Sequence, residues 1–259
     1  MPETVKLNYH ASGHGLPVVL LHGFPLNHTI WRAVESDLSD TFQIIAPDLR
    51  GHGSSPAPAG IYEMSLLAAD VLGLLDDIGI RQAAILGHSL GGYVALAAWR
   101  IAPERILGFG LVASHALADT EEGRQGRRRM ADQVAAEGPQ VAATAMLPKV
   151  FSPDLPLTSP IVDQVRTMIL STSATGIIGT QLGMAARPDS TELLASIHVP
   201  ALVLAGEKDQ IVPLARAQTT ASTLPRGTLS VINNVGHMPM LESPGDTTAA
   251  LRCFLNQLH

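Results

Sequence analysis

The chain of 259 residues is 46% hydrophobic and 15% charged, which provides enough apolar material for a large core and shows little sign of disorder. Its net charge of −6 at pH 7 argues against a nucleic-acid-binding protein, because neutralising phosphates requires a clustered positive excess. The single cysteine excludes an internal disulfide framework, and no secretory signal or bilayer-length apolar run is visible. We therefore expect a soluble cytoplasmic protein that does not interact with nucleic acid or membranes.

Apolar runs and amphipathic helices alternate through the first 113 residues. The apolar runs predict strands over 17–21, 42–46, 83–86 and 106–113, and the spacing between them predicts helices over 29–38, 65–78 and 93–102. Short connections between alternating strands and helices predict a parallel, doubly wound sheet. Ligands of such a sheet bind outside the carboxyl ends of its strands.

The strand signal vanishes between residues 114 and 197. This stretch predicts helical segments over 120–137 and 139–147, broken by the first of several prolines at Pro148. It also holds four of the eight methionines, a residue type that fills irregular apolar space. The stretch is either an ordinary helical subdomain core or a cap that shapes a substrate pocket, and both can hold.

The alternation resumes with a strand over 201–205, a helix over 214–224 and a strand over 228–232. A last helix is expected to start at Pro244, with Ser243 as its N-cap, and to run towards Leu258 with Cys253 as a buried, inert thiol. We therefore expect one sheet domain, residues 1–113 and 198–259, interrupted by a helical cap insertion, residues 114–197.

Residues 82–102 contain the pattern that carries chemistry. A buried strand, a glycine-rich turn and an Ala-rich helix place Ser89 at the apex of a G-x-S-x-G nucleophile elbow. Gly87 and Gly91 supply the small neighbours that such a strained turn requires. A phosphate-binding loop would need a lysine after the last glycine, where this chain has Tyr93. Ser89 is therefore the expected nucleophile.

A serine hydroxyl needs a base to take its proton, and the chain has ten histidines. His237 follows the strand over 228–232 at the sheet edge where Ser89 is expected, so it is the predicted base. His88 adjoins the nucleophile but cannot curl back onto it. We interpret His22 and His52, on loops that follow earlier strands, as hydrogen-bonded structural residues.

The base needs an acid to orient its ring. Asp209 lies just beyond the strand over 201–205 and is the predicted acid, with Asp119, which follows the strand over 106–113, as the alternative. The order Ser89, Asp209, His237 is the order in which the elbow architecture uses its three residues.

The tetrahedral intermediate of acyl transfer needs two N–H donors directed at its oxyanion. One should be the backbone N–H of Leu90, directly after the nucleophile. The other should be the N–H of Phe24, in the loop over 22–25, because Pro25 has no N–H to donate. Phe24 and Leu90 are the predicted oxyanion hole.

Five motifs together resemble the α/β-hydrolase superfamily over nearly the whole chain. They are His-Gly-Phe-Pro (22–25), Asp-Leu-Arg-Gly-His-Gly-Ser-Ser (48–55), Gly-His-Ser-Leu-Gly-Gly (87–92), Gly-Glu-Lys-Asp-Gln-Ile-Val-Pro (206–213) and Gly-His-Met-Pro-Met-Leu-Glu-Ser-Pro (236–244). The chain is similar to the bacterial branch of carboxylesterases, 3-oxoadipate enol-lactonases and cofactor-free haloperoxidases. The resemblance implies an α/β-hydrolase fold in which Asp48 and Arg50 make structural hydrogen bonds.

The same resemblance narrows the reaction. Dehalogenases and epoxide hydrolases of this fold need aspartate at the elbow, so Ser89 favours hydrolysis of a small ester or lactone through an acyl-enzyme, without a cofactor or metal. A carbon–carbon bond hydrolase, a perhydrolase and a non-enzymatic small-molecule receptor on the same scaffold remain alternatives, and a homo-oligomer is compatible with the sequence.

One dense basic run bears on the substrate's charge. Arg124 and Arg128 share one face of the expected helix, whereas Arg127 and Arg129 point away from each other. At most two of these side chains could enter one pocket, and nearby glutamates can pair with the others. We therefore expect a solvated basic face and a neutral or weakly polar substrate, with recognition of a carboxylate as the alternative.

Overall fold

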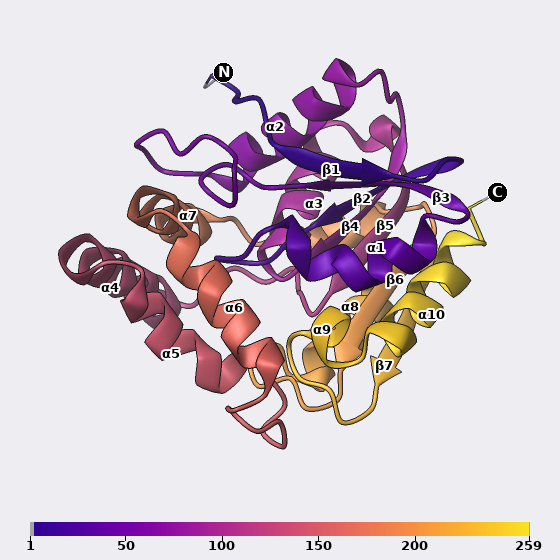
Figure 1. Ribbon diagram of the computed structural model, residues 1–259. Coiled ribbons are helices and arrows are strands. Elements are labelled where there is room, and N and C mark those ends of the chain that lie inside the picture. The colour runs from indigo at the N-terminus through magenta and orange to yellow at the C-terminus, as the bar shows by residue number, and fades with distance from the viewer. Residues whose placement is uncertain (1–2, 259) are drawn as a thin grey trace.

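The computed structural model describes residues 3–258, and a seven-stranded sheet runs through its centre (Figure 1). The strand order is β1-β3-β2-β4-β5-β6-β7, and all neighbouring pairs are parallel except β1 and β3. The predicted doubly wound, mostly parallel sheet is confirmed. The strands are β1 (Tyr9–Ser12), β2 (Leu16–Leu21), β3 (Phe42–Pro47), β4 (Ala83–His88), β5 (Ile106–Val112), β6 (Ala201–Gly206) and β7 (Gly227–Ile232).

The central strands are continuous apolar runs because helices cover both of their faces. Residues 18–21 of β2 and 83–86 of β4 have no exposed surface at all. Strand β1 was not predicted, since it has no apolar run: three of its four residues are exposed. It pairs antiparallel with β3, in the register Tyr9 with Pro47, and forms one edge of the sheet.

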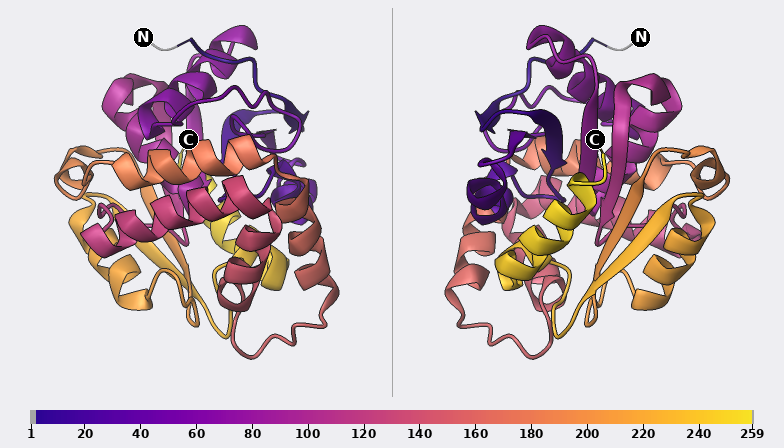
Figure 2. Two further views of the ribbon diagram at one scale, coloured as in Figure 1. Left: turned by 90° about the vertical axis from the view of Figure 1, so that its left-hand side faces the viewer. Right: turned by 90° about the vertical axis from the view of Figure 1, so that its right-hand side faces the viewer.

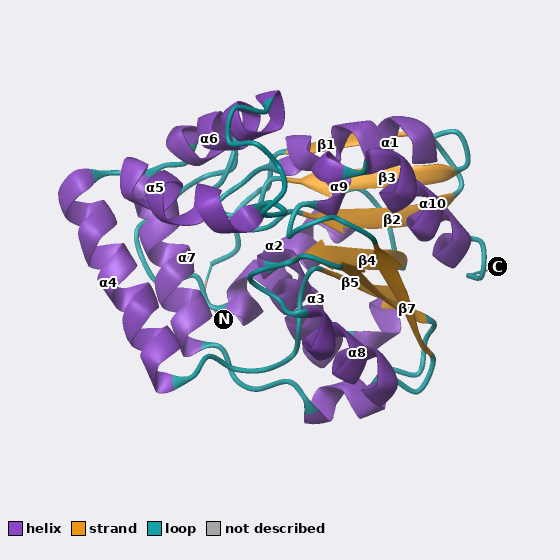
Figure 3. Cartoon of the chain, turned by 90° about the horizontal axis from the view of Figure 1, so that it is seen from below, coloured by secondary structure: helices purple, strands orange, loops and turns teal. Residues whose placement is uncertain are grey.

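Helices lie on both sides of this sheet (Figure 3). One side carries α1 (Arg32–Leu38), α9 (Pro239–Glu242) and α10 (Pro244–Leu255), and the other carries α2 (Met64–Asp77), α3 (Leu90–Ile101) and α8 (Leu214–Thr223). Short 3₁₀ helices occupy His28–Trp31, Pro103–Arg105 and Glu192–Ser196. The core between the layers is built from large, fully buried side chains that include Trp31, Phe42 and Phe109.

Four helices lie between β5 and β6, and we refer to them as the cap: α4 (Glu121–Glu137), α5 (Gln140–Val150), α6 (Pro160–Ser171) and α7 (Ala174–Ala186). They lie together on one side of the core, beyond the carboxyl ends of the strands (Figures 2 and 3). Two of them begin at hydroxyl caps, since Thr120 accepts from the Gly123 N–H and Ser173 from the Gly176 N–H.

Three local predictions were wrong. Helix α5 continues through Pro148, which lies in its last turn. The proline is tolerated because the carbonyl group that it cannot pair, that of Thr144, belongs to an exposed residue. The segment predicted as one helix over 29–38 is a 3₁₀ turn followed by α1. Cys253 is exposed, because Leu251, Phe254 and Leu255 of the same helix form the face that meets the core.

Within residues 3–258, no helix combines the length and the apolar character that crossing a membrane would require.

Candidate active site

Ser89 lies between the end of β4 and the start of α3, with a backbone φ of 49° and ψ of −110°. A positive φ is strained for a residue with a side chain, and such strain gathers at functional sites. The backbone of Ser89 is held on both sides of this turn. Its N–H donates to the Val112 carbonyl at 2.9 Å, and its carbonyl accepts from the Ser114 hydroxyl at 2.8 Å.

The elbow tolerates no side chain on its first glycine. A Cβ atom on Gly87 would lie 2.1 Å from the backbone of Gly91, so the turn closes only when this position is bare. Ser89 itself stays partly exposed, although residues 83–88 before it are all buried. The turn therefore presents one hydroxyl group at the carboxyl edge of the sheet.

His237 and Asp209 come from the loops after β7 and β6, and the structure joins them. Nδ1 of His237 lies 2.8 Å from Oδ2 of Asp209, and both side chains are buried. The other carboxylate oxygen of Asp209 accepts the N–H groups of Ile211 at 2.8 Å and Val212 at 2.9 Å. These bonds fix the carboxylate of Asp209, so the ring of His237 donates from Nδ1 and its Nε2 is the atom able to accept a proton.

His88 links the nucleophile elbow to the loop of His237. Its Nε2 lies 2.9 Å from the His237 carbonyl oxygen, and the two imidazole rings are 5.0 Å apart. Burial holds the pKa of His88 well below its ordinary value, so the ring is neutral and donates this hydrogen bond. Sequence reasoning excluded His88 as the base but did not predict its bond to the loop of His237. The one clue in the sequence was that His88 stands next to Ser89.

The predicted oxyanion donors belong to segments that contact Ser89. A Cβ on Gly23 would lie 3.3 Å from the Cβ of Ser89, so the loop over 22–25 packs directly on the elbow. Phe24 follows in that loop and is buried. Leu90 is the first residue of α3, where a backbone N–H has no partner within the helix. Both predicted donors thus belong to segments that lie next to Ser89.

Asp119, the alternative acid, has other partners. Its carboxylate pairs with Arg127 of α4 and lies 2.8 Å from Arg187, which follows α7. These arginines hold its pKa down at about 2, although burial alone would raise it. Asp119 therefore ties the start of the cap to its end, and Asp209 is the carboxylate that contacts His237.

The polar residues of the loop over 48–55 are hydrogen-bonded locally. Arg50 makes two bonds to Asp70, at 2.7 and 2.8 Å, and Asp48 accepts from the N–H of His28 and the N–H of Ser54. The resemblance to α/β hydrolases implied structural hydrogen bonds for Asp48 and Arg50, and the structure contains them.

His22 is buried against this loop, and His52 is a buried residue of the loop itself. His22 accepts the Leu49 N–H at 2.9 Å, and Nδ1 of His52 lies 3.0 Å from the Arg50 carbonyl. Burial lowers the pKa of His22 to about 4, and burial together with the neighbouring His22 lowers that of His52 to about 3. Both rings are therefore neutral at pH 7.

The buried histidines should make the fold acid-sensitive. Below pH 6.5 the unfolded chain binds protons at these rings that the folded protein does not, so stability falls as the pH drops from 6.5 towards 4. His22 alone accounts for about 3 kcal/mol over this range. Urea unfolding at pH 7, 5.5 and 4.5 measures the slope. His52→Asn should flatten it and the exposed His14→Asn should not; equal slopes in both variants would contradict the assignment.

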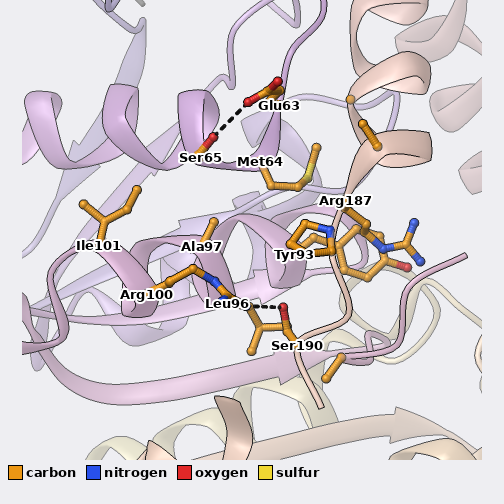
Figure 4. Close-up of a pocket in the computed structure, with 14 residues that line it drawn as sticks. Glu63, Met64, Ser65, Tyr93, Leu96, Ala97, Arg100, Ile101, Arg187 and Ser190 are labelled. Carbon is orange, nitrogen blue, oxygen red and sulfur yellow. Dashed lines mark hydrogen bonds between the residues drawn. The ribbon is translucent and has the colours of Figure 1, made fainter. Parts of the chain in front are cut away.

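A cavity of about 320 Å³ lies between α2, α3 and the residues that follow α7, and it contains none of the three residues Ser89, Asp209 and His237 (Figure 4). Tyr93 lines it one turn after Ser89, and the guanidinium of Arg187 lies 4.2 Å from the centre of the Tyr93 ring. Arg100 reaches across it to the Ser190 hydroxyl at 3.2 Å.

Across residues 3–258, no group of three or more histidine, cysteine, aspartate or glutamate side chains is arranged to hold a metal ion.

The sheet, the elbow and the strand-end loops define an α/β hydrolase. The chain matches the alpha/beta hydrolase fold family over residues 17–244 and belongs to it. It is similar to a thermophilic esterase from Thermogutta terrifontis, with a TM-score of 0.95 and 39% identity over 98% of this chain and 94% of that one. It is also similar to the enol-lactonase from Burkholderia xenovorans LB400, with a TM-score of 0.88 and 27% identity over 96% of both chains.

Curated relatives extend the range of reactions. Epoxide hydrolase A from Mycobacterium tuberculosis is 30% identical over 98% of this chain and 95% of its own length. The chain spans 64% of the length of another relative, the dihydrolipoyllysine-residue acetyltransferase component of an acetoin cleaving system from Pseudomonas putida, at 29% identity. Membership of this family therefore establishes the α/β-hydrolase fold, and similar proteins with this fold act on several kinds of bond.

Proposed function

We propose that the protein is a serine hydrolase that cleaves small carboxylic esters or lactones through an acyl-enzyme on Ser89. The observation that carries the proposal is the strained elbow of Ser89 at the sheet edge that also holds the His237–Asp209 hydrogen bond. The likeness to the esterase and the enol-lactonase supports the same class of reaction.

The geometry suggests a role for each group. His237 takes the proton of the Ser89 hydroxyl as that oxygen attacks the substrate carbonyl, and Asp209 stabilises the imidazolium that forms. The N–H groups of Phe24 and Leu90 donate to the oxyanion. The imidazolium then gives its proton to the departing alcohol, and a water molecule activated by His237 releases the acid from Ser89.

The residue at the elbow favours this reaction over epoxide opening. Epoxide hydrolases of this fold attack with an elbow aspartate, and this chain has Ser89 between His88 and Leu90. A serine ester is the intermediate of acyl transfer, so the likeness to the epoxide hydrolase extends to the fold and family.

The arginines of α4 favour a neutral substrate. Arg127 is paired with Asp119 and reaches Gln181 at 3.3 Å, and Arg124 lies 3.9 Å from Glu121. Arg128 and Arg129 are exposed. Arg127, Arg128 and Arg129 are therefore paired or solvated and leave no dedicated partner for a substrate carboxylate. The buried Nε of Arg124 has no hydrogen-bond partner in the part of the chain that the structure describes, so Arg124→Ala is the substitution that tests the carboxylate alternative most directly.

A substrate panel tests the proposal. The protein should hydrolyse short p-nitrophenyl esters or lactones, and kcat/KM for a neutral ester should exceed that for its ω-carboxylate analogue. Changing Arg124, Arg128 or Arg129 to alanine should alter this ratio only slightly. A preference for the acidic analogue of about tenfold or more, abolished by one arginine substitution, would show a carboxylate-binding pocket instead, because one charged hydrogen bond is worth about that much.

A further inference from the structure

The corner of the cap that follows α5 contacts the loops of both His237 and Asp209. This cap corner comprises Val150, Phe151, Ser152, Pro153 and Asp154. The carbonyl of Val150 accepts the His237 N–H at 3.1 Å. A Cβ atom on Gly236 would lie 2.2 Å from the backbone nitrogen of Ser152, so the cap corner and the base loop (residues 233–238) are in direct backbone contact.

The cap corner is bonded to the loop of the acid as well. Gln210, next to Asp209, donates from its side chain to the Phe151 carbonyl at 3.1 Å. Lys208, on the other side of Asp209, pairs with Asp154. One short segment of the cap thus contacts the residues that flank the acid and the residue expected to act as base.

Glu242 is the side chain that joins these parts. Its carboxylate accepts the N–H groups of Gly236 and Met238, each at 3.1 Å, which lie on either side of His237. The same carboxylate accepts the Ser152 N–H of the cap corner at 2.8 Å. Three backbone donors from two segments distant in sequence converge on one anion, which makes strong, charge-assisted hydrogen bonds.

We propose that Glu242 is a positioning residue for His237. Through Glu242, the cap corner helps to hold His237 and Asp209 in place. This inference rests on the proposed function, since it assumes that His237 is the base. Holding both neighbours of His237 fixes the backbone that carries its ring. Displacing a catalytic group by about 1 Å can cost about a hundredfold in rate.

Glu242→Gln tests the proposal, because it keeps the size of the side chain but removes the charge and turns an NH₂ group towards the backbone donors. We expect kcat to fall by about a hundredfold with KM nearly unchanged. Glu207→Gln is the matched control: Glu207 accepts the N–H of Asn234 in the same base loop at 2.8 Å, but it is exposed and does not contact the cap. Its kcat should equal that of the wild type.

A spectroscopic readout separates positioning from a general loss of structure. The low-field proton resonance of the His237–Asp209 hydrogen bond should shift or broaden in Glu242→Gln and stay in place in Glu207→Gln. Glu242→Asp keeps the negative charge, but its side chain is one methylene group shorter. The kcat of this variant should therefore lie between those of the wild type and Glu242→Gln. An unchanged resonance together with a wild-type kcat in Glu242→Gln would overturn the proposal.

The rate of reaction with a fluorophosphonate distinguishes the two levels of the account. If the positioning role is wrong but the serine mechanism is right, the wild type and Glu242→Gln will be labelled at Ser89 equally fast. If the serine mechanism itself is wrong, neither protein will be labelled there. Slower labelling in Glu242→Gln alone is the result we expect.

Discussion

Replacing Ser89 with alanine should lower kcat by roughly four to six orders of magnitude, because the acyl-enzyme can no longer form. The fold should survive, since alanine keeps the Cβ atom and the backbone of residue 89 keeps its bonds to the Val112 carbonyl and the Ser114 hydroxyl. Steady-state kinetics on a p-nitrophenyl ester, together with the melting temperature, measure both effects. Ser65→Ala, at an exposed serine, is the matched control and should retain full activity.

A Ser89→Ala protein that still turns over the ester at more than about one hundredth of the wild-type rate would contradict the assignment. Residual catalysis from the oxyanion donors and from substrate binding is far smaller than that.

Asp209→Asn should have the second-largest effect, a loss in kcat of roughly four orders of magnitude. The neutral amide of asparagine cannot stabilise the imidazolium. Its oxygen accepts the N–H groups of Ile211 and Val212, so its NH₂ group faces His237. The ring then presents the wrong tautomer to Ser89. Kinetics over a range of pH measure the loss, and circular dichroism checks the fold.

Asp119→Asn is the informative comparison, because Asp119 is the other candidate carboxylate. It pairs with Arg127 and Arg187 at the two ends of the cap, so its loss should reduce the free energy of unfolding by about 1–3 kcal/mol and leave kcat within about tenfold. If Asp119→Asn lost most of its kcat while Asp209→Asn kept the wild-type kcat, Asp119 and not Asp209 would be the acid.

The sequence could predict features that depend on short-range geometry. The elbow is one, because the strained turn at Ser89 requires glycine two residues before it, at Gly87, and two residues after it, at Gly91. The central strands are another, since burial on both faces leaves the continuous apolar run seen at 18–21. Asp209 could be chosen as the acid because it lies just beyond the strand over 201–205 and fits the chain order of serine, acid and histidine. In the structure β6 and β7 are neighbours, and the loops that follow them bring Asp209 and His237 into contact.

Features that depend on partners far away in the chain could not be predicted. Strand β1 has exposed side chains, and only its pairing with β3 makes it a strand. The bonds of Glu242 are made to backbone N–H groups, which carry no residue identity and therefore leave no pattern. The exposure of Cys253 depends on which face of α10 meets the core, and the apolar residues around it did not reveal this.

Intact-mass spectrometry after reaction with a fluorophosphonate tests the central claim most directly. The nucleophilic serine of a serine hydrolase bonds to the phosphorus of this reagent and displaces fluoride. We therefore expect one adduct per chain, located on Ser89 by peptide mapping. Ser89→Ala should remain unlabelled under the same conditions. An unlabelled wild-type protein, or an adduct on another residue that persists in Ser89→Ala, would contradict the claim that Ser89 is the nucleophile.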